Sequence, residues 1–181
     1  MRCRNCKQKF EVKRFNQKYC DELECRTAEA MDNLKKIKTK QDKDWKKRKK
    51  EMKEDLKSLQ DWYNEALEIF NTYIRLRDKD KPCVSCGAKA GTYTISSGHY
   101  FPQGNNRAIA LDERNAHGQC WYNCNSSKSG NLSEYYPELI NRIGQKGYED
   151  LQRLRHQTKR YTVDELKDIK EYYKEKIKKN Q

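Results

Sequence analysis

Eight cysteines arranged in four close pairs constrain the fold of this chain more than any other feature. The pairs are Cys3/Cys6, Cys20/Cys25, Cys83/Cys86 and Cys120/Cys124. Pairs at this spacing are typical of thiolate zinc sites, and two pairs complete one closed tetrahedral site. No apolar signal stretch at the N-terminus directs the chain to an oxidising compartment, which favours zinc over disulfides. We therefore expect two structural zinc ions in a soluble, cytoplasmic protein.

The composition favours a polyanionic partner. The 181 residues carry a net charge of +13, with 37% charged and only 34% hydrophobic residues. This hydrophobic share is low for a large core, and bound metal would help small lobes to fold. The charge predicts a nucleic-acid partner, although a solubility surface or a ribosomal-type protein would show the same balance. No apolar run is long enough to cross a bilayer.

We expect an α+β fold that is predominantly helical, in three parts. Residues 1–31 form an N-terminal zinc finger with four cysteine ligands, resembling a small treble-clef or ribbon-type finger. The acidic Asp21 and Glu22 favour a helix start at its second cysteine pair. The finger either caps the next helix or contacts DNA, and it offers these basic residues for contact: Arg2, Arg4, Lys7, Lys9, Lys13 and Arg14.

Residues 32–81 contain no Pro or Gly and predict a long basic helix or coiled-coil arm. Its second half carries an apolar stripe expected to pack on the following domain, made of Leu59, Trp62, Tyr63, Ala66, Ile69, Phe70, Tyr73 and Ile74. Its first half, residues 35–57, holds 12 basic and 5 acidic residues. This half is either a phosphate-contacting arm or a linker helix, and heptad-spaced Trp45 and Met52 also permit a dimer seam. The candidate DNA contacts are Lys46, Lys47, Arg48, Lys49 and Lys50.

Residues 82–181 form the third part, with helices at its C-terminal end. A helix is expected over 134–148, stopping near Gly144 or Gly147, and a short one follows around Leu151. Thr162 and Glu165 have the spacing of a capping box, which predicts a final helix over 163–179. The lone His156 lies among basic residues and receives no catalytic role.

The segment 83–131 carries the candidate chemistry. Zinc held by Cys83, Cys86, Cys120 and Cys124 would lock the loop of His99, after a strand at 92–96, against a helix beginning near Asn125. Buried cysteines packing as small hydrophobic residues are the alternative.

A neutral imidazole at His99 suits general-base work near neutral pH. Asn115 is expected to orient its ring through a hydrogen bond. At the expected helix start, the side-chain oxygen of Asn125 would ligate Mg²⁺ or Mn²⁺, and Lys128 one turn later would hold a phosphate. Arg107 is a further candidate DNA contact.

The order C-x-x-C, G-H, N, C-x-x-x-C-N-x-x-K resembles the zinc-stabilised HNH, or ββα-metal (treble-clef), endonuclease motif. In that family the first His is the general base, a middle Asn or His supports it, and a residue at the helix start binds the catalytic metal. Carried over, these are His99, Asn115 and Asn125. The strings G-H-Y, N-x-H-x-Q-C, C-N-x-x-K-S-G-N and L-I-x-R-I-G are similar to the phage NinG (Rap) family of recombination proteins.

The resemblance implies a structure-selective endonuclease that cuts branched DNA recombination intermediates, such as D-loops and Holliday junctions, in the host-cell cytoplasm. The chain departs from the HNH pattern where Gly98 replaces the usual Asp or His metal ligand and Ser129 lies one turn after Asn125. We expect His117 to complete the catalytic metal site, with Ser97 as second choice, although His117 would equally well hold the zinc knuckle through a backbone carbonyl.

Two other functions remain open. A non-catalytic zinc-containing protein would dock on DNA as an accessory, and an RNA-directed protein would use the interleaved tyrosines and basic residues. Cutting two strands of a junction favours a homodimer.

Overall fold

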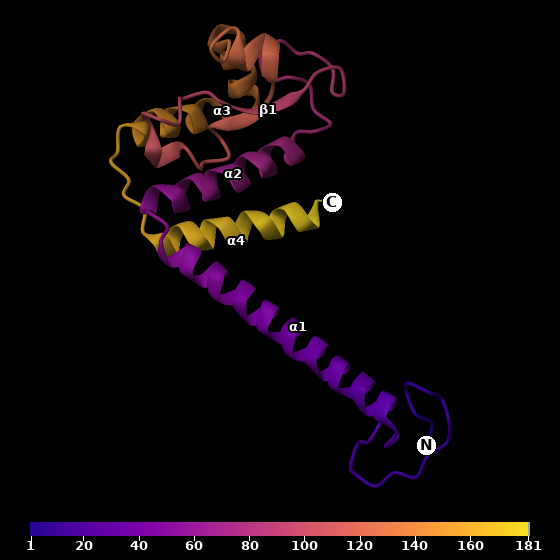
Figure 1. Ribbon diagram of the computed structural model, residues 1–181. Helices are drawn as coiled ribbons and strands as arrows, with labels where there is room; N and C mark the ends of the chain where they lie inside the picture. Colours follow the sequence, from indigo (N-terminus) through magenta and orange to yellow (C-terminus); the bar gives the residue numbers. More distant parts are fainter. Residues whose placement is uncertain (181) are drawn as a thin grey trace. The chain divides into compact units, whose positions relative to one another are not determined.

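The structure, a computed structural model, describes residues 1–180 and is mostly helical with one two-stranded sheet (Figure 1). This confirms the predominantly helical α+β class. Contacts divide the chain into two compact units, Met1–Leu56 and Lys57–Gln181. No helix of the described residues is both long enough and apolar enough to span a bilayer.

The first unit is the cysteine finger continued directly into helix α1 (Leu23–Asp55). An isolated bridge between Arg2 and Lys9 closes the first cysteine turn, and Cys25 lies in the first turn of α1, where it is the buried residue of that helix. Tyr19 donates a hydrogen bond to Asp32 on α1. Because the fourth cysteine belongs to the helix, the finger has no boundary at residue 31.

The predicted single arm over 32–81 is two helices. The second, α2 (Leu59–Arg77), begins at a capping box in which the Ser58 Oγ accepts from the Asp61 amide at 3.2 Å and Asp61 accepts from the Ser58 amide at 2.9 Å. These bonds satisfy amide groups that a continuous helix would have paired internally. The compact unit boundary therefore falls after Leu56, rather than after residue 81.

Helix α2 packs along helix α4 (Val163–Lys179), and the two run in the same direction (Figure 1). Lys170 of α4 donates to Glu65 of α2 at 2.6 Å. The expected Thr162–Glu165 capping box and the expected span of α4 are both confirmed. Six of the eight residues of the predicted apolar stripe of α2 are buried, whereas Ile69 is half-buried and Leu59 is exposed; the buried residues are Trp62, Tyr63, Ala66, Phe70, Tyr73 and Ile74.

The sheet is an antiparallel hairpin of β1 (Ile95–His99) and β2 (Ala116–Cys120), with Gly98 opposite His117 and His99 opposite Ala116. Ala116 packs into the cluster of Phe70 on α2. The other face meets α3 (Leu132–Arg155), which kinks at Gly144 where φ is +71°. Strand β1 begins three residues later than the predicted strand. Two short turns complete the unit, η1 (Arg107–Ile109) and the π-helical η2 (Trp121–Ser126).

Asp78 at the end of α2 fastens the hairpin to that helix. Its carboxylate is 1% exposed, accepts from the Gly118 amide at 2.9 Å, and pairs with Arg77 at 2.7 Å and Lys81 at 2.9 Å. Burial raises the pKa of Asp78, but these hydrogen bonds outweigh it and hold the pKa below its usual value.

Candidate functional site

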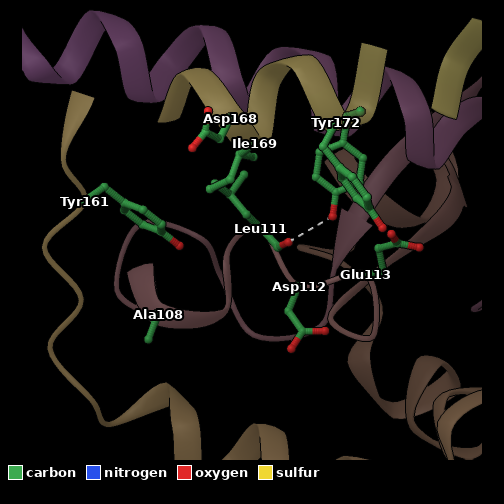
Figure 2. Close-up of a pocket in the computed structure, with 9 residues that line it drawn as sticks. Ala108, Leu111, Asp112, Glu113, Tyr161, Asp168, Ile169 and Tyr172 are labelled. Atoms are coloured by element: carbon green, nitrogen blue, oxygen red, sulfur yellow. Dashed lines mark hydrogen bonds between the residues drawn. The ribbon is translucent and has the colours of Figure 1, made fainter. Parts of the chain in front are cut away.

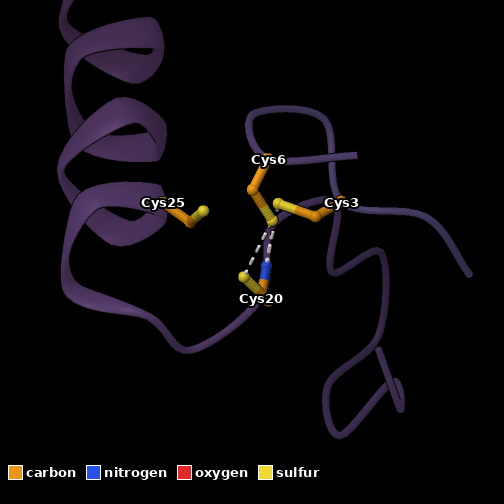
Figure 3. Close-up of side chains that lie close together, drawn as sticks. All are labelled: Cys3, Cys6, Cys20 and Cys25. Atoms are coloured by element: carbon orange, nitrogen blue, oxygen red, sulfur yellow. Dashed lines mark hydrogen bonds between the residues drawn. The ribbon is translucent and has the colours of Figure 1, made fainter. Parts of the chain in front are cut away.

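The four cysteines of the first unit converge on one point (Figure 3). Their sulfur atoms all lie within 4.8 Å of one another, and Sγ of Cys6 is 3.7 Å from Sγ of Cys20. In the second unit the sulfurs of Cys83, Cys86, Cys120 and Cys124 converge in the same way.

Both sets have dimensions that fit zinc. In the second unit Sγ atoms lie 3.6 Å apart for Cys86 and Cys120, and 3.9 Å apart for Cys83 and Cys124. A tetrahedron with Zn–S bonds of about 2.3 Å has edges of about 3.8 Å. A disulfide would need about 2.05 Å. The two sets of four cysteines are therefore each able to hold a zinc ion, in the groupings that the spacing predicts.

The two cysteine sites share the same supporting hydrogen bonds. The first sulfur of each set accepts from the backbone amide of the third cysteine, Cys20 to Cys3 at 3.3 Å and Cys120 to Cys83 at 3.2 Å. Burial raises the pKa of Cys3, but the backbone amides of Cys20, Cys6 and Asn5 outweigh it and lower the pKa to about 6. Amide donors favour the thiolate, which is the form that binds metal.

The second cysteine site fixes the end of the hairpin. Cys120 ends β2 and Cys124 lies in η2, so the site joins the loop of Cys83 to both elements. The helix predicted to begin near Asn125 begins instead at Leu132. Asn125 lies instead in the π-helical turn η2, between β2 and α3. This turn forms because residues 120–124 must bend to bring the sulfurs of Cys120 and Cys124 to one point.

His99 is half-buried at the end of β1, with its ring 6.0 Å from the ring of Phe70. Its Nε2 lies 2.9 Å from the carbonyl oxygen of Ala110. A carbonyl only accepts, so Nε2 carries the proton and Nδ1 of the neutral ring keeps its lone pair. Burial lowers the pKa of His99 below 6.5, which favours this neutral form. The imidazole is thus held as a base at neutral pH.

Asn115 is fully buried and binds backbone rather than His99. Its Oδ1 accepts from the Phe101 amide at 2.9 Å, and its Nδ2 donates to the carbonyls of Phe101 at 3.0 Å and Ile109 at 3.2 Å. In place of the expected hydrogen bond with Asn115, the His99 ring donates to the carbonyl of Ala110. Asn115 instead holds together the two chain segments that follow β1.

Asn125 lines a hollow of about 460 Å³ beside the edge of β1. Its Nδ2 donates to Ser96 Oγ at 3.2 Å, which leaves its Oδ1 for a ligand. Ser97 lines the same hollow, and Ser97 and His99 point to the same face of β1 because side chains alternate along a strand. His99 does not itself line the hollow and lies two residues, about 7 Å of strand, beyond Ser97.

Helix α2 adds residues to this hollow that the sequence analysis missed. Asn71 and Arg75 line it, and both the Oδ1 of Asn71 and the Oγ of Ser97 are buried without a hydrogen-bond partner among the described residues. Buried polar atoms are rarely left unpaired, so both atoms call for a ligand or water. Nothing in the local motif marks Asn71, which lies outside the segment 83–131 and is recognisable only once α2 is placed against β1.

His117 does not join Asn125. Its ring faces α3, where Nδ1 lies 2.9 Å from the Tyr135 hydroxyl, which in turn donates to the Gly98 carbonyl at 3.0 Å. Burial and then the neighbouring Arg77 and Arg142 lower the pKa of His117 to about 3. A cation beside these arginines would be repelled, so this position does not support the expected metal role of His117, and Ser97, which lines the hollow, is better placed.

The glycine that replaces the usual ligand before His99 has a packing reason. A Cβ on Gly98 would lie 2.2 Å from Oε1 of Gln119, which is itself fully buried. Position 98 also points to the Gln119 face of the hairpin, away from Ser97 and His99. The clash with Gln119 therefore explains why this chain has glycine at position 98.

The candidate DNA-contacting cations are all exposed. Lys128 follows η2, and Lys46 to Lys50 lie along α1. The guanidinium of Arg107 stacks 4.3 Å from the centre of the Tyr63 ring. The structure leaves their DNA contacts as predictions.

A larger hollow of about 660 Å³ lies between α4 and the segment around η1 (Figure 2). Asp112, Glu113 and Asp168 line it together with tyrosines, among them Tyr173, whose hydroxyl donates to the Leu111 carbonyl at 3.4 Å. Asp112 pairs with Arg114 and Glu113 with Lys176, and no cation is among the residues lining this hollow, so it offers no site for a phosphate.

Comparison with known proteins places the chain in a family. A family model described as Bacteriophage Lambda NinG protein matches residues 1–181. Protein ninG of Escherichia phage lambda is 36% identical over 190 residues, covering 98% of this chain and 91% of that protein. Protein ninG of Salmonella phage P22 is 35% identical, covering 98% of this chain and 92% of that protein.

Protein ninG of Escherichia phage 933W is 42% identical over 123 residues, covering 68% of this chain and 60% of that protein. The match thus spans less than two thirds of the 933W relative. No solved structure matches the chain. The family model and the phage relatives together show that this chain belongs to the NinG family of bacteriophage proteins.

Proposed function

We propose that this protein is a metal-dependent endonuclease that hydrolyses phosphodiester bonds in branched DNA recombination intermediates. The observation that carries the proposal is the hydrogen bond from His99 Nε2 to Ala110. It fixes the ring so that Nδ1 is the basic atom, and burial keeps that atom unprotonated at neutral pH.

In the proposed reaction His99 Nδ1 removes a proton from water, and the resulting hydroxide attacks phosphorus. The bond from phosphorus to the 3′ oxygen breaks and that oxygen takes a proton from water, leaving a 5′ phosphate and a 3′ hydroxyl. Side-chain oxygens of Asn125, Ser97 and Asn71 would hold Mg²⁺ or Mn²⁺ in the hollow. When bound, the ion neutralises the phosphate and the leaving oxygen. Arg75 and Lys128 supply positive charge to neighbouring phosphates.

The cysteine sites have a structural role in this proposal. A zinc ion with four thiolate ligands has no open position for substrate. In the second unit it holds η2 against β2, and therefore holds Asn125 near Ser96. Loss of that zinc would misplace Asn125 relative to β1 without touching His99.

Cleavage of matched substrates tests the proposal. The purified protein is incubated with four-way, three-strand and linear DNA of shared sequence, with Mg²⁺, Mn²⁺ or EDTA, and zinc is measured on the same sample. We expect cleavage of the branched substrates that needs the divalent ion. Binding without any product under every condition would instead support the second candidate.

The second candidate is a non-catalytic zinc-containing accessory protein that binds DNA. It is favoured by the ligand set of the Asn125 hollow, which is neutral apart from Arg75 and contains no carboxylate. Mg²⁺ sites in proteins usually include one or two carboxylates. An ion held here would therefore depend on the substrate phosphate for much of its binding.

A further inference from the structure

A second hollow opens along α2, on the same side of the helix as the hollow of Asn125. It has a volume of about 290 Å³, at the small end of the range for ligand pockets. Its lining residues are Gln60, Tyr63, Asn64, Leu67, Gln103, Gly104 and Arg107.

The lining combines a flat surface with amide groups. The guanidinium of Arg107 stacks on the Tyr63 ring at 4.3 Å, which presents a planar group to the hollow. Arg107 donates to Gln60, and Gln60 donates to Oδ1 of Asn64 at 2.8 Å. This chain of bonds leaves Nδ2 of Asn64 and the whole amide of Gln103 for a ligand.

The chemistry fits a nucleobase better than a phosphate or a metal ion. Bases stack on aromatic rings and guanidinium planes, and side-chain amides match their donor and acceptor edges. The lining contains one positive charge, Arg107, whereas phosphate sites use several cations. It contains no carboxylate that would hold a cation.

The position along α2 relates this hollow to the proposed cleavage site. Four residues of α2 follow one another at intervals of four, seven and four positions, so they share one helix face. They are Gln60, Asn64, Asn71 and Arg75. Asn64 and Asn71 are about 10 Å apart along the axis. At 3.4 Å per nucleotide this is about three nucleotides of one strand. Phe70, which packs against His99, lies between the two hollows along the helix.

We propose that this hollow binds one unpaired nucleobase of the DNA strand whose phosphate lies beside His99. The inference rests on the proposed function, since it takes DNA as the ligand. A base within a duplex is stacked between its neighbours, so only an unpaired base can swing out, stack on the guanidinium of Arg107 and meet the amides of Asn64 and Gln103. The pocket would therefore direct the protein to branch points, where bases lose their partners.

The test measures binding to three DNA duplexes at one fixed salt concentration and in EDTA, which prevents cleavage. One duplex is fully paired, one has a single extra unpaired base, and one has an abasic site at the same bulge. The double variant Asn64→Ala/Gln103→Ala removes two exposed amides from the hollow. The matched control Gln145→Ala/Gln152→Ala removes two exposed amides from α3.

We expect the unmodified protein and the control to bind the base bulge about tenfold more tightly than the abasic bulge, as one good base contact would give. The hollow variant should lose that ratio and keep its affinity for paired duplex. Equal affinity of the unmodified protein for both bulges would overturn the proposed base-binding role of the hollow. An unchanged ratio of the two affinities in the hollow variant would also overturn it. This test measures binding alone. Failure to cut DNA in the separate cleavage assay would refute the proposed nuclease but would leave the base preference measured here unchanged.

Discussion

The Nε2 atom of His99 lies 2.9 Å from the carbonyl oxygen of Ala110, so a backbone group fixes the protonation of a candidate catalytic ring. Ala110 is fully buried and follows η1 directly. Asn115 binds the carbonyl of Ile109, the neighbour of Ala110, at 3.2 Å. The sequence predicted that Asn115 would orient the His99 ring directly. Asn115 instead holds the backbone of the η1 segment, and that backbone holds the ring.

The first prediction concerns the pH dependence of cleavage. The protonated imidazole is inactive as a base, and burial lowers the pKa of His99 below 6.5. The rate should therefore rise with pH through a midpoint below 6.5 and level off before pH 7.5. Single-turnover cleavage of a branched substrate between pH 5 and 8 measures this midpoint. A midpoint clearly above 6.5 would show that another group is titrating.

The second prediction concerns Asn115. Replacement by Ala removes three buried hydrogen bonds and leaves the Phe101 amide without a partner. We expect the free energy of unfolding of the second unit to fall by about 2–4 kcal/mol, at roughly 1 kcal/mol for each bond plus the cost of the orphaned donor. Asn105→Ala, at an exposed position nearby, is the control. Equal denaturation midpoints for the two variants would contradict the assigned role.

The third prediction concerns Asp78. Asp78→Asn keeps the shape of the side chain but removes the charge that Arg77 and Lys81 share. We expect a loss of about 2–4 kcal/mol in the free energy of unfolding, slightly less than for a fully buried pair because Lys81 is half-exposed. Asp164→Asn removes an exposed carboxylate paired with Lys167 and should cost less than 1 kcal/mol. Urea denaturation of both variants compares them.

The fourth prediction concerns metal content. The unmodified protein should contain two zinc ions per chain, and Cys20→Ser and Cys120→Ser should each retain one. Only Cys120→Ser should lower the thermal stability of residues 57–181, since Cys120 ends β2. Atomic emission on the purified proteins measures zinc. Two ions in either variant, or none in the unmodified protein, would show that the cysteine sites are misassigned.

The sequence predicted those elements whose signals are local. Thr162 and Glu165 located the start of α4, and the cysteine spacing grouped the eight sulfurs correctly. The same capping geometry at Ser58 and Asp61 was missed, because a run without Pro or Gly gave no reason to break the helix. That omission placed α2 in the arm instead of the second unit.

Contacts between distant segments were not predictable. The pairing of Asn115 with the backbone of Phe101 and Ile109 depends on how two loops fold back after β1. The position of His117 follows from the packing of α3, whose Tyr135 hydroxyl lies 2.9 Å from Nδ1 of His117. The sequence placed this strand at 92–96, whereas β1 begins at Ile95, so the pairing of β1 with β2 was known only from the structure.

The most direct test of the account is the rate at which His99→Ala cuts branched DNA. The variant should keep two zinc ions and its DNA affinity, because His99 contacts neither cysteine site nor, in the proposed reaction, any phosphate directly. The cleavage rate should fall by about 10²–10⁴, the usual contribution of a general base. Single-turnover cleavage by a folded, zinc-loaded variant at the rate of the unmodified protein would contradict the account.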